Sequence, residues 1–126
     1  MKIAISSSGQ TLDADLDPRF GRCPYYIILD TDTDSYDVIV NNAASGSGGA
    51  GIQAAETVSH YGVRAVFTGQ IGPNAYRVLA AAGIDCYTGC RGTIQDVVRS
   101  YQSGELQPTT KPTSPGHTGM GKKGRF

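Results

Sequence analysis

The sequence contains no tryptophan, few cysteines and no long apolar run. Its three cysteines, Cys23, Cys86 and Cys90, form an odd set without a CxxC pair. This set predicts neither a disulfide framework nor a zinc site built from paired cysteines, and it favours a reducing compartment. No apolar run approaches the roughly 20 residues that a membrane helix requires, and no apolar signal-peptide core precedes the first strand. We therefore expect a cytoplasmic protein without a membrane span.

Charged residues are also scarce, at 17% of the chain, and they are unevenly distributed. All 11 acidic residues lie within residues 1–105, whereas Lys111, Lys122, Lys123 and Arg125 lie beyond them. The part of the chain before the tail therefore carries a net negative charge. A negative surface repels phosphate backbones, so the composition predicts no binding to nucleic acid.

The chain length of 126 residues fits one domain. Residues 107–126 are rich in Pro, Thr, Gly and Lys and have almost nothing apolar before Phe126. Such a segment cannot bury enough apolar surface to offset the entropy lost on ordering. We therefore expect a folded domain over residues 1–106, followed by a flexible basic tail over residues 107–126.

Hydrophobic periodicity predicts strands that alternate with helices. The first helix is expected after residue 51, the second opens at Gly72-Pro73, and the third opens at a capping box, Thr93 to Asp96. The strands are expected over residues 2–5, 25–30, 36–41, 63–67 and 84–87, with the second and third forming a hairpin.

Right-handed crossovers and the adjacency of sequential strands leave few layouts for these elements. The simplest is an α/β fold with a five-stranded mixed sheet in the order 3-2-1-4-5, in which strand 2 is antiparallel. The other four strands then end at the same edge of the sheet. The loops at that edge, residues 6–9, 41–51, 68–72 and 88–93, are expected to surround the crevice in which open α/β sheets bind ligands.

Glycine-rich turns occupy these loops, and glycine lets backbone N–H groups approach a ligand beside a helix N-terminus. Residues 46–51 match the pattern G-x-G-x-x-G between a strand and a helix. No acidic residue lies between Glu56 and Asp85 to hold a ribose, and the lysine of a P-loop is absent, so a dinucleotide or P-loop site is disfavoured. Anion binding at the helix N-terminus and a purely connecting loop both remain open.

The run Asp17–Arg22 places two arginines around one apolar residue. We expect Phe20 to insert into the core and fix the loop. Arg19 and Arg22 would then present planar donor groups to an anion in the crevice. The alternative is that one of these arginines pairs with an aspartate of residues 13–17.

Two of the cysteines lie in or near the loops at this edge. Cys23 and Cys90 would suit a soft metal or a metal-sulfur cluster, although a single loop cysteine is more often a bystander. Cys86 lies within a strand and is expected to pack in the core, while His117 in the tail is a further candidate ligand. No paired carboxylates and no Ser-His-Asp set are found at the crevice, so we do not expect an enzyme.

Four motifs in this order resemble the dinitrogenase iron-molybdenum cofactor biosynthesis family. They are DPRFGR at residues 17–22, GAGIQAA at 49–55, TGQIGPN at 68–74, and AGIDCY, GT and YQSGEL within 82–106. The resemblance covers about residues 1–106. It implies a three-layer ribonuclease H-like motif fold, without nuclease chemistry, in a stand-alone single-domain member of the kind found in anaerobic bacteria and archaea.

The resemblance also implies a function. The crevice is expected to carry an anionic metal-sulfur cluster, such as an iron-molybdenum cofactor precursor or a related Mo/Fe sulfide cluster, which the protein exchanges with cluster donor and acceptor proteins. One related carrier holds its molybdenum-copper sulfide cluster largely without covalent ligands, so arginines and backbone amides can suffice. Some relatives have tails dense in His and Cys, whereas this tail offers only His117 and Met120.

Together these arguments give a set of candidate residues and one alternative function. The alternative is a regulatory or interaction module that binds a nucleotide, a small phosphate or a protein partner at the same edge. The sequence predicts no oligomeric state. The candidate binding residues are Ser7, Arg19, Arg22, Cys23, Asn42, Gly48, Gly49, Gly51, Gly69, Gln70, Gly72, Cys90 and Gly92, with Cys23, Cys90 and His117 as candidate metal ligands.

Overall fold

The computed structural model describes residues 1–42, 49–110 and 112–113. Strands and helices alternate along this part of the chain after an initial run of three strands. The elements are β1 (Lys2–Ser7), β2 (Tyr25–Asp30), β3 (Tyr36–Val40), α1 (Ala50–Ser59), β4 (Val63–Phe67), α2 (Pro73–Ala81), β5 (Asp85–Tyr87) and α3 (Ile94–Gln102).

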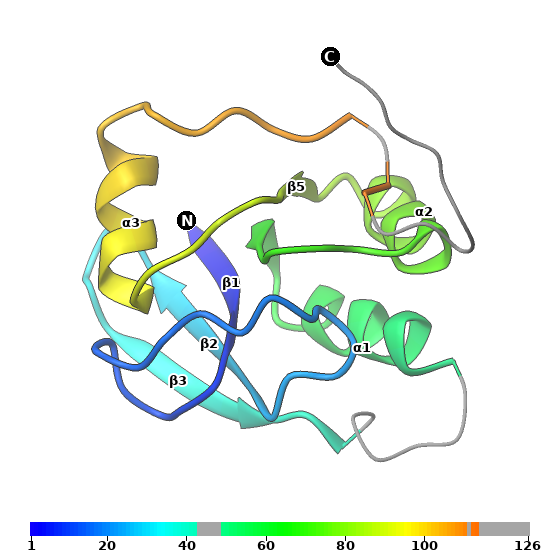
Figure 1. The fold of residues 1–126 in the computed structure, drawn as a ribbon, viewed down its shortest axis with the longest axis horizontal. Helices are drawn as coiled ribbons and strands as arrows, with labels where there is room; N and C mark the ends of the chain where they lie inside the picture. Colours follow the sequence, from blue (N-terminus) through cyan, green and yellow to red (C-terminus); the bar gives the residue numbers. More distant parts are fainter. Residues whose placement is uncertain (43–48, 111, 114–126) are drawn as a thin grey trace.

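The five strands form one mixed sheet in the order β3-β2-β1-β4-β5 (Figure 1). β2 is antiparallel to β1 and β3, whereas β4 and β5 run parallel to β1 and to each other. The predicted strand order and direction are therefore confirmed. β1 extends beyond its expected end because Ser6 and Ser7 still pair with Tyr26 and Tyr25 of β2.

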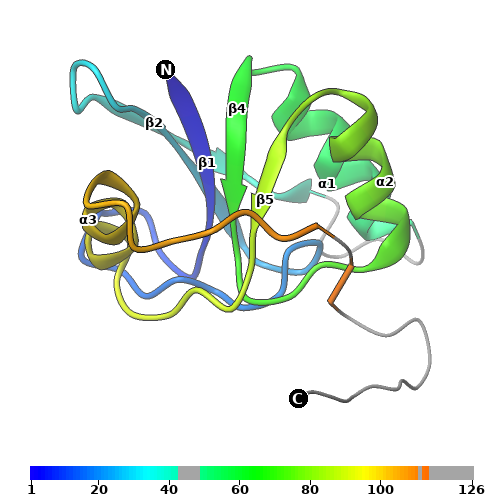
Figure 2. The same ribbon diagram turned by 90° about the horizontal axis from the view of Figure 1, so that it is seen from above.

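Helices cover both faces of the sheet (Figure 2). α1 and α2 lie on one face, where they pack on Ala4 of β1 and Val66 of β4. α3 lies on the other face against Ile3, Ile5 and Phe67. Because both faces are covered, β1 is buried at every position after Lys2, and its residues 3–5 form a continuous apolar run. Within the described residues, no helix is long and apolar enough to cross a membrane.

The chain that follows α3 lies along the outer edge of β5 (Figure 2). We call residues 107–110 with 112–113 the C-terminal strap. The backbone N–H of Thr109 donates to the carbonyl oxygen of Cys86 at 2.6 Å. Farther along, Thr113 is hydrogen bonded to Ile71, the residue two positions before α2, in both directions at 3.1 Å.

The sequence places a flexible tail from residue 107 onward, whereas the structure shows that its first residues are bonded to the sheet and to the start of α2. The physical reason is that the strap satisfies backbone groups of an edge strand, and this requires no apolar side chains. Hydropathy therefore gives no sign of it. The domain boundary at residue 106 stays a prediction.

α3 begins at the predicted capping box, which supports a test of stability. The side chain of Thr93 accepts a hydrogen bond from the N–H of Asp96, and the Asp96 carboxylate accepts one from the N–H of Thr93, both at 3.1 Å. We expect Thr93→Ala to lower the free energy of unfolding by about 1 kcal/mol because it removes an N-cap. Urea unfolding followed by circular dichroism measures this loss.

The matched control is Thr57→Ala. Thr57 lies within α1 with its hydroxyl exposed to solvent, and this hydroxyl donates to the carbonyl of Gln53 one turn earlier. Its removal should change the free energy of unfolding by no more than about 0.5 kcal/mol. Equal losses in the two variants would contradict the assigned role of the cap.

Candidate functional site

The segment Asp17–Arg22 crosses the edge of the sheet at which β1 and β4 end. The N–H of Gln70 donates to the carbonyl of Pro18 at 2.8 Å, and the N–H of Phe20 donates back to the carbonyl of Gln70 at 3.4 Å. Phe20 is only 2% exposed, and its ring centroid lies 5.4 Å from that of Tyr26. Phe20 therefore fixes the segment in the core, as the sequence predicts.

Two glycines let this segment lie directly on neighbouring backbone. A Cβ on Gly69 would lie 2.6 Å from Cβ of Pro18, and one on Gly21 would lie 2.9 Å from Cα of Gly51. Neither distance is compatible with a side chain unless the backbone shifts. The segment is thus in contact with both the β4–α2 loop and the start of α1.

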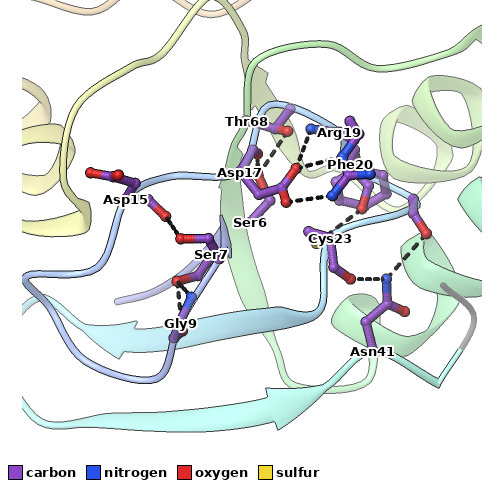
Figure 3. Close-up of polar contacts among 12 residues, drawn as sticks. Ser6, Ser7, Gly9, Asp15, Asp17, Arg19, Phe20, Cys23, Asn41 and Thr68 are labelled. Carbon is purple, nitrogen blue, oxygen red and sulfur yellow. Dashed lines mark hydrogen bonds and ion pairs between the residues drawn. The ribbon is translucent and has the colours of Figure 1, made fainter.

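Polar side chains hold the segment at both of its ends (Figure 3). The Ser6 hydroxyl donates to the carbonyl of Asp17 at 2.6 Å and lies 2.8 Å from the Thr68 hydroxyl. At the other end, the buried Asn41 amide donates to the carbonyls of Gly21 and Cys23, at 3.1 and 2.8 Å. Ser6 and Asn41 are not among the candidate residues predicted from the sequence, although a polar residue at a strand end is the available signal for such a contact.

A pocket of about 370 Å³ lies between this segment and the starts of α1 and α2. Backbone and small side chains make up much of its wall. Asn74 and Ala75, in the first turn of α2, also line it and were not selected from the sequence, although their positions next to the predicted helix start are the available signal. The predicted residues that line it are Arg19, Arg22, Gly49, Gly51, Gln70 and Gly72.

Two helix N-termini meet at the pocket. α1 has Gly49 as its N-cap and α2 has Gly72, and neither cap residue provides a side-chain hydrogen bond. Neither helix has an acidic residue in its first turn, in contrast to α3. The first N–H groups of a helix have no partner within the helix and carry partial positive charge, so this arrangement favours an anion.

Arg19 joins these groups at the pocket and also pairs with Asp17 (Figure 3). Its Nε and Nη2 atoms donate to the two carboxylate oxygens at 3.0 and 2.8 Å. The Asp17 side chain is 7% exposed and that of Arg19 is 63% exposed. The guanidinium lowers the pKa of Asp17. The pair with Asp17 uses two of the five guanidinium N–H donors of Arg19. Arg19 therefore both pairs with an aspartate and lines the pocket.

The remaining candidate residues do not line this pocket. Ser7 is buried at the end of β1, and Gly69 is packed against Pro18. Asn42 and Gly92 are exposed, the latter just before α3 on the other side of the sheet. Gly48 and His117 lie outside the described residues.

The structure does not bring Cys23 and Cys90 together. Cys23 is fully buried in the core under α1 and α2, whereas Cys90 is buried in the core under α3. Burial raises the pKa of each thiol to about 11. Within the described residues, no group of three or more His, Cys, Asp or Glu side chains is arranged to hold a metal ion. A role for either thiol as a ligand stays a prediction.

Comparisons with known proteins agree with the resemblance drawn from the motifs. The family model for dinitrogenase iron-molybdenum cofactor matches residues 1–104. An uncharacterized protein of Methanocaldococcus jannaschii is 31% identical over 110 residues, which span 85% of this chain and 90% of the relative.

Solved structures with the same fold include two that are 31% identical to this chain. One is the apo form of the orange protein from Desulfovibrio gigas, with a TM-score of 0.87 over 90% of this chain and 96% of that one. The other is a protein from Thermotoga described as NifB-like, with a TM-score of 0.79 over 91% of this chain and 98% of that one.

The pairing of Asp17 with Arg19 predicts a pH-dependent stability difference. Asp17→Asn should lower the free energy of unfolding at neutral pH by about 1.5–3 kcal/mol, because it removes a hydrogen-bonded charge. The pKa of Asp17 is lower in the folded than in the unfolded chain. Its stabilisation is therefore present above the unfolded pKa and is lost as pH falls through the folded one.

We therefore expect the gap between wild type and Asp17→Asn in urea unfolding to be constant near neutral pH and to narrow as pH falls below the unfolded pKa of about 4. Asp37→Asn, at an exposed position of β3, is the control and should show only a small gap. A gap for Asp17→Asn that widens on acidification would contradict the pairing.

The buried thiols predict low reactivity in the native protein. All three cysteines are free and buried, and a pKa of about 11 leaves Cys23 and Cys90 protonated near neutral pH. A disulfide reagent at about pH 8 should modify all three thiols in denaturant and react at least about tenfold more slowly in the native state. If one thiol reacts rapidly in the native protein, it is accessible as a thiolate, and this would support its predicted role as a metal ligand.

Proposed function

Because the chain belongs to the dinitrogenase iron-molybdenum cofactor family, we propose that it is a non-enzymatic carrier of an anionic metal-sulfur cluster. The cargo is an iron-molybdenum cofactor precursor or a related molybdenum or iron sulfide cluster. It binds in the pocket between the segment Asp17–Arg22 and the starts of α1 and α2. One observation carries this proposal, namely that two helix N-termini without side-chain caps and Arg19 line the same pocket.

The lining favours a complete cluster over a bare metal ion. Among the described residues that line the pocket, none is a histidine, cysteine or acid. A cation would therefore meet positive helix ends and guanidinium groups without a compensating ligand. A cluster that brings its own sulfide ligands instead accepts hydrogen bonds from N–H groups through its sulfur atoms. Cys23 and Cys90 are not needed for this kind of binding.

The wall of the pocket is apolar as well as positive. Ala50 and Ile52 contribute from α1, and Pro73 and Ala75 contribute from α2. Sulfide is larger and less strongly hydrated than an oxide, so contact with methyl groups costs little desolvation. The volume of about 370 Å³ falls in the range of small-ligand sites. This combination suits a compact thiometallate better than a strongly hydrated oxyanion.

A carrier also has to take up and release its cargo. Because the Arg19 side chain is 63% exposed, part of the pocket wall faces solvent and is available to another protein. We assign cluster donor and acceptor proteins as the partners. The setting that suits such cargo is the cytoplasm of an anaerobe, in which sulfide clusters are protected from oxygen.

Cluster retention tests this function. The protein is incubated without oxygen with tetrathiomolybdate, and separately with iron, sulfide and molybdate, and is then desalted. Metal analysis and visible absorption report what remains bound. We expect wild type to retain molybdenum and Arg19→Ala/Arg22→Ala to bind at least about tenfold more weakly, because charge-assisted hydrogen bonds are lost.

The matched control is Arg64→Ala/Arg99→Ala, which removes the same charge at two exposed positions outside the pocket lining. It should bind like wild type. Retention by wild type no greater than by the pocket variant would contradict the proposal.

The alternative function is tested by thermal shifts over a panel of nucleotides and inorganic phosphate. Helix N-termini also bind phosphate groups, and a ligand that binds only the folded state raises its apparent stability. If one nucleotide stabilises the protein in a saturable way and tetrathiomolybdate has no effect, the carrier proposal would be wrong and a regulatory module would be the better function.

A further inference from the structure

The C-terminal strap satisfies both backbone polar groups of one buried residue. Ile71 is 1% exposed and directly precedes Gly72, the N-cap of α2. Its N–H donates to the Thr113 hydroxyl at 3.1 Å, and its carbonyl accepts from the Thr113 N–H at 3.1 Å. A buried backbone group without a partner bears its full desolvation penalty. The position of Ile71 is therefore tied to that of Thr113.

A second contact fixes the strap at its other end. The Thr109 N–H donates to the carbonyl of Cys86, and the Thr109 hydroxyl accepts from the N–H of Thr88 at 3.2 Å. The Tyr76 hydroxyl, on α2, donates to the carbonyl of Thr109 at 3.5 Å. The strap is thus bonded to β5, to α2 and to the loop before α2, and both views show it passing beside these elements (Figures 1 and 2).

The strap is bonded to a residue whose two neighbours in the chain line the pocket. Gln70 and Gly72, the neighbours of Ile71 in the chain, both line the pocket. Gln70 is also the residue whose backbone bonds the Asp17–Arg22 segment. The family match ends at residue 104, so the strap lies beyond the part of the chain that the family model describes.

We propose that the strap is a positioning element of the pocket and that Thr113 is its positioning residue. By bonding both sides of Ile71, Thr113 holds residues 70–72, and with them the N-terminus of α2, in the orientation that a bound anion requires. When the strap is displaced, residues 70–72 lose two hydrogen bonds that orient them, those from Thr113 to the N–H and the carbonyl of Ile71. The strap therefore couples the state of the tail to the affinity of the pocket. This inference rests on the proposed function.

The test uses the full chain with single substitutions. Thr113→Val removes the hydroxyl at nearly constant volume, Thr113→Ser keeps it, and Thr110→Val changes an exposed strap residue. Amide hydrogen exchange by NMR reports the N–H of Ile71, and titration with tetrathiomolybdate reports the dissociation constant. For Thr113→Val we expect faster exchange at Ile71 and binding that is weaker by about threefold to tenfold.

Two controls separate positioning from general stability. Thr113→Ser should restore both the exchange protection and the affinity, and Thr110→Val should change neither. Thr93→Ala weakens the cap of α3, on the opposite face of the sheet. It should leave tetrathiomolybdate binding at the wild-type level even though the protein unfolds more easily.

The outcomes are distinct. Unchanged exchange at Ile71 in Thr113→Val, or faster exchange with wild-type affinity, would overturn the positioning role while the carrier function stands. Equal weakening in Thr93→Ala would also overturn it, because general stability would then explain the effect. A wild-type protein that binds no tetrathiomolybdate would overturn the proposed cargo and this inference together.

Discussion

The backbone pairing between the Asp17–Arg22 segment and Gln70 is the constraint on which the pocket depends. The two hydrogen bonds connect a long loop to the end of β4, where an ordinary loop would only pass over the edge. They form because Gly69 has no side chain to hold Pro18 away. Phe20 then fixes the segment from the core side. A wall without regular secondary structure is thereby held in place by backbone hydrogen bonds and by one buried side chain.

The electrostatics of the pocket follow from backbone geometry as much as from charged residues. Helix N-termini provide positive potential that does not depend on pH and leaves the net charge of the chain unchanged. Asp17 offsets part of the charge of Arg19 and also restricts its orientation. Part of the chain's positive charge is thus used to fix geometry, while the helix N-termini at the pocket provide positive potential from backbone groups that are held in place. A protein with a net negative folded part can therefore still bind an anion.

The sheet order, the capping box of α3 and the anchoring role of Phe20 could be predicted because each depends on local pattern or on general rules of connection. The residues that line the pocket could be predicted only in part. Loops that end at one edge of a sheet can still belong to different faces, and Gly92 leads to α3 while Gly49 and Gly72 begin helices on the other side. The same division separates Cys23 from Cys90. Side-chain contacts such as that of Asn41 leave no periodic signal in the sequence.

The strap also covers backbone groups at one border of the sheet. β5 has only three residues, and an uncovered strand of this kind offers backbone groups to any neighbouring chain. Thr109 already bonds to the carbonyl of Cys86, while the opposite border strand, β3, exposes the charge of Asp37. Each border of the sheet thus has its own barrier to intermolecular pairing. A chain cut at the limit of the family match would lose one of them and gain a site for aggregation.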